Sequence, residues 1–82
     1  MNIILCLAEE IGLIERDLKE IEEYIENNEW GIALEVLCSI LHQNNIYISI
    51  NQYETICDLG NKMEFNDELW RDLKVCRQEI QE

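Results

Sequence analysis

The sequence predicts an all-α fold, a compact four-helix domain with a long N-terminal helix and a buried second helix. Three observations lead to this prediction. Apolar residues recur at helical spacing in the first third of the chain, proline is absent, and only three glycines interrupt 82 residues. With 48% hydrophobic and 29% charged residues, residues 1–82 suit one small globular domain. The core of so short a chain is thin.

The first predicted helix spans about residues 2–26. Its apolar stripe has alternating spacings of three and four and consists of Ile4, Leu7, Ile11, Ile14, Leu18, Ile21 and Ile25. This period places the stripe on one side of a helix about 37 Å long. Gly12 is its weak point, where the helix could kink or split. The seven-residue period also allows a coiled coil, but it ends after about three heptads, which favours packing within the chain.

The second predicted helix runs from Glu29 to His42 or Gln43. It is apolar on nearly every side, which indicates a buried central helix. Asparagines at 27–28 end the preceding helix, because asparagine tolerates the left-handed conformation. Residues 46–50 alternate like a strand, but a single strand has nothing to pair with. We therefore interpret them as an extended connector that inserts an isoleucine into the core.

Two further helices complete the predicted domain. Ser49 and Gln52 have the spacing of a capping box, which starts the third helix near residue 50. Its inner face consists of Tyr53, Ile56, Cys57, Gly60 and Met63. Asn66, followed by acidic residues, suits the start of a fourth helix that runs to about residue 80. That helix is expected to bury Leu69, Trp70 or Leu73, Cys76 and Ile80, and to direct Arg71, Lys74 and Arg77 outward.

The four cysteines, Cys6, Cys38, Cys57 and Cys76, are spread singly along the chain. No CxxC pair or neighbouring histidine gives the spacing of a zinc site. Each cysteine has apolar neighbours at helical spacing, where a reduced thiol packs as a small hydrophobe. One or two disulfides would require an oxidising compartment, of which the sequence gives no sign. We expect reduced core cysteines and neither a metal nor a cofactor.

No catalytic constellation is recognisable. A nucleophilic site needs a histidine beside serine or cysteine and an orienting acid, but His42 is the only histidine and ends a predicted helix. The chain has no glycine-rich phosphate loop and no calcium-binding loop. The sequence therefore predicts a protein that is not an enzyme.

The charge is strongly acidic, with 18 Asp and Glu against 6 Lys and Arg and a net charge of −12. Such a surface repels phosphate backbones and anionic membranes, so a basic partner is its natural complement. The first seven residues lack the basic leader of a secretory signal, and no apolar run reaches the ~18–20 residues of a membrane span. We expect a cytoplasmic protein.

Carboxylates concentrate in residues 9–29, where nine acids accompany only two cations. One interpretation is a solvated helix face, and the other is a docking face for a cationic partner. The acids crowd toward the end of the first predicted helix and its following turn, at Glu22, Glu23, Glu26 and Glu29. Negative charge there opposes the helix dipole, a cost that a partner's lysines and arginines could offset.

The second predicted helix carries the most distinctive pattern in the chain. It reads Glu29-Trp30-Gly31-Ile32-Ala33-Leu34-Glu35-Val36-Leu37-Cys38-Ser39-Ile40-Leu41 and is followed by Ile48-Ser49, Tyr53, Ile56, Leu59 and Met63. Over residues 13–75 this pattern resembles the MafI-like immunity proteins of bacterial polymorphic-toxin and contact-dependent growth inhibition systems. Its least generic part is residues 31–38, and residues 1–6 do not match it.

The resemblance implies a cytoplasmic antidote that binds a cognate secreted toxin, usually a nuclease and often an RNase, and has no activity of its own. Such a nuclease needs a cationic cleft for RNA, which an acidic inhibitor can cover. We expect a 1:1 complex, a monomer otherwise, and contacts around the turn after the first helix and at residues 44–49. The candidate contact residues are Glu22, Glu23, Glu26, Glu29, Glu35, Tyr47, Glu54 and Asp58.

There are two alternatives to an immunity protein. A helical adaptor or oligomerising module would use the isoleucine-rich stripe of the first helix as its interface, and sedimentation would then show a dimer or a higher oligomer. A small acidic enzyme or metal carrier lacks ligands for its chemistry, and zinc content after purification tests it.

Overall fold

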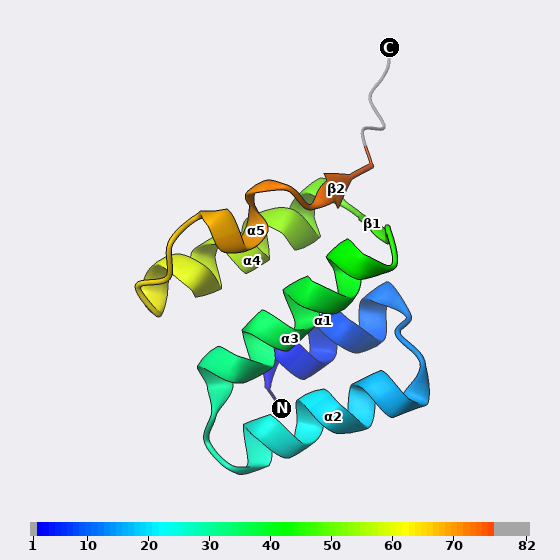
Figure 1. Cartoon of the computed structure of the whole chain (residues 1–82), viewed down its shortest axis with the longest axis vertical. Coiled ribbons are helices and arrows are strands. Elements are labelled where there is room, and N and C mark those ends of the chain that lie inside the picture. Colours follow the sequence, from blue (N-terminus) through cyan, green and yellow to red (C-terminus); the bar gives the residue numbers. More distant parts are fainter. Residues whose placement is uncertain (1, 77–82) are drawn as a thin grey trace.

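The computed structural model describes residues 2–76, which are mostly helical (Figure 1). The all-α prediction is therefore confirmed at the level of fold class. The elements in chain order are α1 (Ile3–Ile11), α2 (Glu15–Glu26), α3 (Trp30–Gln43), β1 (Tyr47–Ile48), α4 (Ile50–Lys62), α5 (Glu68–Arg71) and β2 (Lys74–Val75). The predicted count of four helices is wrong for this part of the chain, which has five. None of these helices has the length and apolar character needed to cross a bilayer.

The long N-terminal helix predicted for residues 2–26 is in fact two helices. Gly12 ends α1 in the left-handed conformation, with φ of 95°, and its N–H donates to the carbonyls of Ala8 and Glu9 at 3.1 Å each. Glycine adopts this backbone conformation without a steric penalty. The helix therefore ends at Gly12 and the chain turns, instead of continuing as one kinked helix. α2 then begins after Ile14, which is extended.

The apolar stripe of the first third still faces the core after this break. Ile4, Leu7 and Ile21 are buried, and the other members except Ile14 are partly buried against the core. Ile14 lies in the turn between the two helices and is 56% exposed. The stripe packs inside the domain, because α1 and α2 both contact α3 and each other. Apart from Ile14, it is therefore not an exposed surface for another chain.

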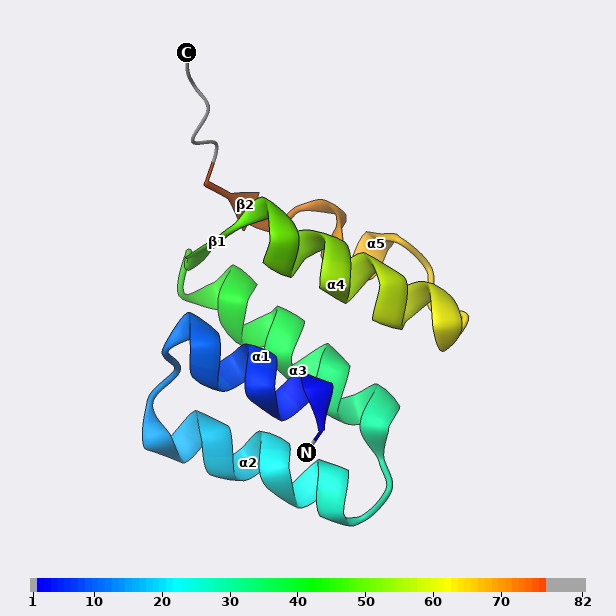
Figure 2. The same cartoon turned by 180° about the vertical axis from the view of Figure 1, so that it is seen from behind.

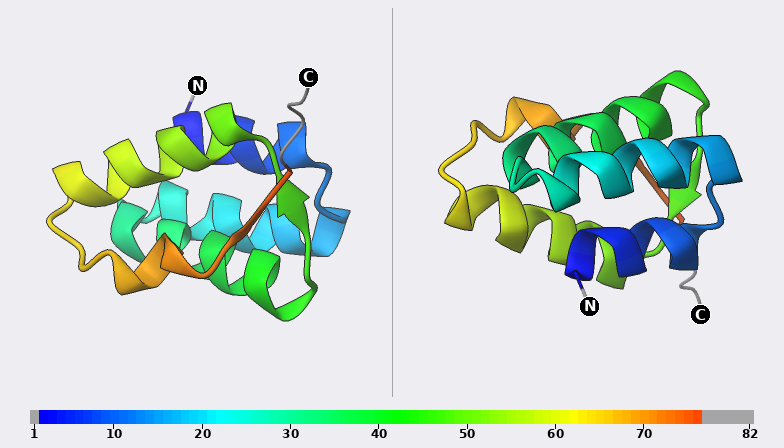
Figure 3. Two further views of the ribbon diagram at one scale, coloured as in Figure 1. Left: turned by 90° about the horizontal axis from the view of Figure 1, so that it is seen from above. Right: turned by 90° about the horizontal axis from the view of Figure 1, so that it is seen from below.

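α3 is the central helix, as predicted. In Figures 1 and 2 it lies between α2 on one side and α4 with α5 on the other, and Figure 3 shows α1 and α4 together on the side opposite α3 and α5. Its buried residues are Ala33, Leu34, Leu37, Cys38, Ile40 and Leu41. The helix is not covered all round, however, since Trp30 and Ile32 near its start are exposed.

The connector at residues 46–50 contains a strand, contrary to the prediction that nothing in the chain could pair with it. β1 pairs in parallel with β2, with Tyr47 opposite Lys74 and Ile48 opposite Val75. The Cys76 N–H extends the pairing by donating to the Ile48 carbonyl at 2.7 Å. The partner strand, β2, lies in the segment that was predicted to belong to the fourth helix. Ile48 is the isoleucine inserted into the core, at 2% exposure.

α4 begins where the capping box predicted. The Gln52 N–H donates to Ser49 Oγ at 3.1 Å, and the Ser49 N–H donates to Gln52 Oε1 at 2.9 Å. Of the predicted inner face, Ile56 and Gly60 are buried, and Tyr53, Cys57 and Met63 are partly buried.

The fourth predicted helix is wrong in length. α5 has only four residues, because Asp72 ends it and the backbone then turns to the strand hydrogen bonds of β2. Trp70 and Leu73 are buried, whereas Cys76 is exposed. Arg77 and Ile80 lie outside the described residues.

Candidate functional site

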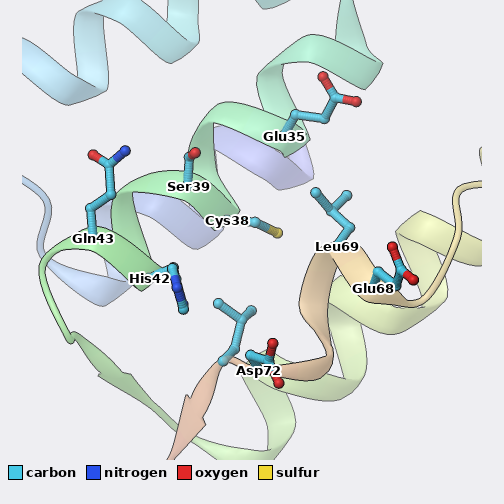
Figure 4. Close-up of a pocket in the computed structure, with 9 residues that line it drawn as sticks. Glu35, Cys38, Ser39, His42, Gln43, Glu68, Leu69 and Asp72 are labelled. Carbon is cyan, nitrogen blue, oxygen red and sulfur yellow. The ribbon is translucent and has the colours of Figure 1, made fainter.

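A groove of about 240 Å³ lies between α3 and α5 (Figure 4). α3 lines it with Glu35, Cys38, Ser39, His42 and Gln43, and the α5 segment lines it with Glu68, Leu69, Asp72 and Leu73. Glu35, Cys38 and His42 follow one another at spacings of three and four, so they share one side of α3. In Figure 4 the Cys38 thiol points toward α5, between Glu35 at one end and His42 at the other.

The groove continues toward the start of α3. A second hollow is lined by Glu35, Phe65, Asn66, Glu68 and Leu69, and it shares three of these residues with the first. We call the two hollows together the α3–α5 groove. It therefore follows the seam between the two helices from Phe65 to Leu73.

Two glycines allow the α5 segment to lie this close to its neighbours. A Cβ atom on Gly60 would overlap the indole ring of Trp70, and one on Gly31 would come within 3.1 Å of Phe65 Cζ. The start of α5 is also fixed by the Asn66 side chain, whose Oδ1 accepts the Glu68 N–H at 3.0 Å. These contacts hold a helix too short to be stable by itself.

The chemistry of the groove divides into an apolar floor and an acidic rim. Cys38 and Leu73 are buried and Leu69 is partly buried, whereas the carboxylates Glu35, Glu68 and Asp72 are exposed. Arg71 lies 3.9 Å from Glu68, but both side chains are largely exposed to solvent. Such a surface ion pair is weak, so the rim stays predominantly negative.

Burial disfavours the thiolate form of the thiol on the floor. Burial raises the pKa of Cys38 to about 12, and the charges of Cys57 and Glu35 act in the same direction. The thiol is therefore protonated near neutral pH, whereas a nucleophile or metal ligand must be a thiolate. In residues 2–76 no three or more His, Cys, Asp or Glu side chains are grouped to hold a metal.

All eight sequence-predicted contact residues are exposed. Four of them lie together at what we call the α2–α3 corner, formed by Glu22, Glu23 and Glu26 on the second half of α2 and Glu29 just before α3. The last turn of α2 contains no basic residue. Trp30, next to this corner, keeps 46% of its surface exposed.

The other four predicted residues do not join that corner. Tyr47 follows the far end of α3, a helix of 14 residues and about 21 Å. Glu54 and Asp58 lie on α4, across α3 from α2 (Figures 1 and 2). Glu35 lines the α3–α5 groove and is the one predicted residue that does so. The predicted set thus covers several faces instead of one.

Glu68 and Asp72 were not among the predicted contact residues. Acids at 67–68 suited the start of a helix, and no local pattern indicated that this segment lies against α3. Their spacing of four residues, which places both carboxylates on one side of a helix, is the signal that could have identified them.

The cysteine prediction is correct only in part. Cys38 is in the core and Cys57 is partly buried, but Cys6 and Cys76 are exposed. Burial also raises the pKa of Cys57. Cys6 lies on α1 with the buried Ile4 and Leu7 but is exposed, contrary to the prediction that each cysteine packs in the core.

Comparisons with protein-family models, with curated proteins and with solved structures found no match to this chain.

Proposed function

We propose that this chain is an immunity protein that binds a basic secreted toxin domain, a nuclease of the RNase type, in the cytoplasm and covers its cationic surface. The observation that carries the proposal is the α2–α3 corner. Glu22, Glu23, Glu26 and Glu29 are all exposed there, and no cation lies on the last turn of α2. Negative charge at a helix C-terminus is unfavourable for the free protein, so a basic partner would relieve a local electrostatic cost.

The physics of nuclease inhibition fits such a surface. A nuclease concentrates lysine and arginine where RNA binds, and a chain with a net charge of −12 is attracted to that region over long range. Complementary charge accelerates association and fixes orientation. The exposed Trp30 beside the corner supplies an aromatic side chain of the kind that anchors tight interfaces. The resemblance of residues 29–41 to MafI-like immunity proteins supports the same class.

The test uses the toxin domain of any large secreted protein encoded immediately upstream. Titration calorimetry is expected to give a 1:1 complex with nanomolar affinity or tighter, and the complex should lack nuclease activity. The double variant Glu22→Lys/Glu26→Lys should weaken binding at low salt by about tenfold or more. Glu54→Lys/Asp58→Lys is a matched control, since it reverses two exposed acids at the same spacing on α4. These two were also predicted contact residues, but the proposal confines the contact to the α2–α3 corner, from which they are separate. An equal loss in both variants would show that net charge, and not the α2–α3 corner, drives association.

The second candidate function is a non-catalytic helical adaptor or oligomerising module. The exposed apolar residues Ile3, Ile14, Trp30, Ile32, Tyr47 and Ile50 favour it. Its predicted interface, the stripe of the first third, is packed inside the domain apart from Ile14. Sedimentation equilibrium separates the two candidates, because an immunity protein is expected to be a monomer until its toxin is added.

A further inference from the structure

The α3–α5 groove presents two kinds of surface, an apolar floor and an acidic rim. Its floor is formed by Cys38, Leu69 and Leu73, and carboxylates flank the floor from both sides. Glu35 comes from α3, whereas Glu68 and Asp72 come from the α5 segment (Figure 4). A ligand must therefore offer apolar surface to the floor and positive charge to the rim.

The size of the groove limits the ligand further. The hollow around Cys38, at about 240 Å³, is below the roughly 300–1,000 Å³ of pockets that enclose a drug-sized molecule. The second hollow, of about 320 Å³, shares the lining residues Glu35, Glu68 and Leu69 with it. The hollow around Cys38 therefore suits a single protruding side chain, and the chain that carries it can follow the seam.

Arginine matches these requirements better than any other side chain. Its aliphatic stem packs on apolar surface while its charged head remains near water. Its planar guanidinium has five donors and can pair with carboxylates on two sides at once, which the ammonium group of lysine does less well. Arginine is also enriched among the residues that dominate interface energetics.

We propose that the α3–α5 groove is the socket for an arginine side chain of the basic protein partner, with the stem over Leu69 and Leu73 and the guanidinium between Glu35 and Glu68. This inference rests on the proposed function for the identity of the partner. The α2–α3 corner then attracts the partner over long range, and the groove fixes its position. One end of the groove lies near the start of α3, where Phe65 packs on Gly31, two residues after Glu29 in the sequence.

The first test measures binding of a defined probe to the ¹⁵N-labelled full chain at low salt. The probe is the peptide acetyl-Ala-Arg-Leu-Arg-Ala-amide, and the control peptide has citrulline, a neutral isostere, in place of each arginine. The arginine peptide is expected to shift the amide signals of the groove residues Ser39, His42, Leu69 and Leu73. The citrulline peptide should leave them unchanged.

Matched variants show whether the groove carries this binding. Glu35→Gln/Glu68→Gln should weaken binding of the arginine peptide by about tenfold, because charge-assisted hydrogen bonds are lost. Glu54→Gln/Asp58→Asn removes the same charge from α4 and should leave the affinity unchanged. All four side chains are exposed, so thermal melts are expected to show that each variant folds like the wild type.

Three results would overturn the inference. These are equal binding of the citrulline peptide, amide shifts confined to the α2–α3 corner, or equal effects of the two double variants. Failure of the proposed function is distinguishable, since it appears as wild-type chain that does not bind the toxin. A toxin that binds Glu35→Gln/Glu68→Gln as tightly as the wild type would leave the immunity function standing and refute the arginine socket.

Discussion

The indole ring of Trp70 occupies the space that a side chain on Gly60 would need. This contact seats the short helix α5 against α4, and α5 in turn forms one wall of the α3–α5 groove. Replacement of Gly60 therefore tests how the groove is supported.

Gly60→Ala is expected to destabilise the protein although alanine favours a helix. The gain in helix propensity is about 1 kcal/mol, whereas overpacking of a core costs about 1–3 kcal/mol and rises when a rigid ring must move. Because the ring is rigid, we expect a net loss toward the upper end of the difference, about 1–2 kcal/mol, in urea unfolding. Gly31→Ala is the comparison, because its Cβ would meet only the edge of the Phe65 ring at 3.1 Å. A stability loss as large for Gly31→Ala would contradict this account.

Gly12→Ala should cost about 1 kcal/mol for a different reason. Nothing lies within 4 Å of a Cβ at this position, so the penalty comes only from the left-handed backbone with φ of 95°. Gly12→Asn is expected to cost less, because asparagine tolerates this conformation. The free energies of unfolding of the two variants check the prediction, and the reverse order would refute it.

Ser49→Ala should lower the free energy of unfolding by about 1 kcal/mol, because it removes the acceptor for the Gln52 N–H at the start of α4. Ser39→Ala is a matched control on the exposed side of α3, away from any helix start. Its effect is expected to be close to zero. Similar losses in both variants would mean that the capping box does not stabilise the fold.

Because of the buried thiol of Cys38, the free energy of unfolding should fall at alkaline pH. Burial raises the pKa of its thiol from 9.0 to about 12, so the folded state keeps the proton that the unfolded chain loses. The contribution of this group is complete below pH 9 and declines as pH rises from about 9 toward 12, since the unfolded state binds fewer protons there. The slope should diminish in Cys38→Ala, as measured by urea unfolding at several pH values.

The same thiol should resist alkylation in the native protein. Iodoacetamide near pH 8 is expected to label the exposed Cys76 well before Cys38, with mass spectrometry locating the label. Urea should abolish the difference. Equally fast labelling of Cys38 in native protein would show that the floor of the groove opens to solvent.

The features that the sequence predicted well depend on neighbours along the chain. The buried helix α3 follows from its apolar composition, and the start of α4 follows from Ser49 and Gln52. Gly12 was identified as a weak point, but a kink and a complete break look alike in sequence. The backbone conformation at Gly12 depends on α2 folding back against α3, which is a tertiary contact.

The features that the sequence did not predict depend on segments far apart in the chain. β1 and β2 have two residues each, too few for a strand pattern, and they pair across 26 intervening positions. Glu35 was a candidate contact residue, but it shares a groove with Glu68 and Asp72 only because α5 packs against α3. The length of α5 depends on its contact with Gly60 and on the strand pair. Local helix propensity therefore does not indicate where α5 ends.

Because of the parallel strand pair, the two walls of the α3–α5 groove are held together more firmly at one end than at the other. β1 follows α3 and β2 follows α5, so backbone hydrogen bonds couple the walls near Leu73. Near Phe65 the walls meet through a side-chain ring packed on Gly31, with no ladder between them. The groove should therefore open more easily at its Phe65 end than at its Leu73 end when a ligand enters. Amide hydrogen exchange should accordingly be faster near Phe65 than beside the strands.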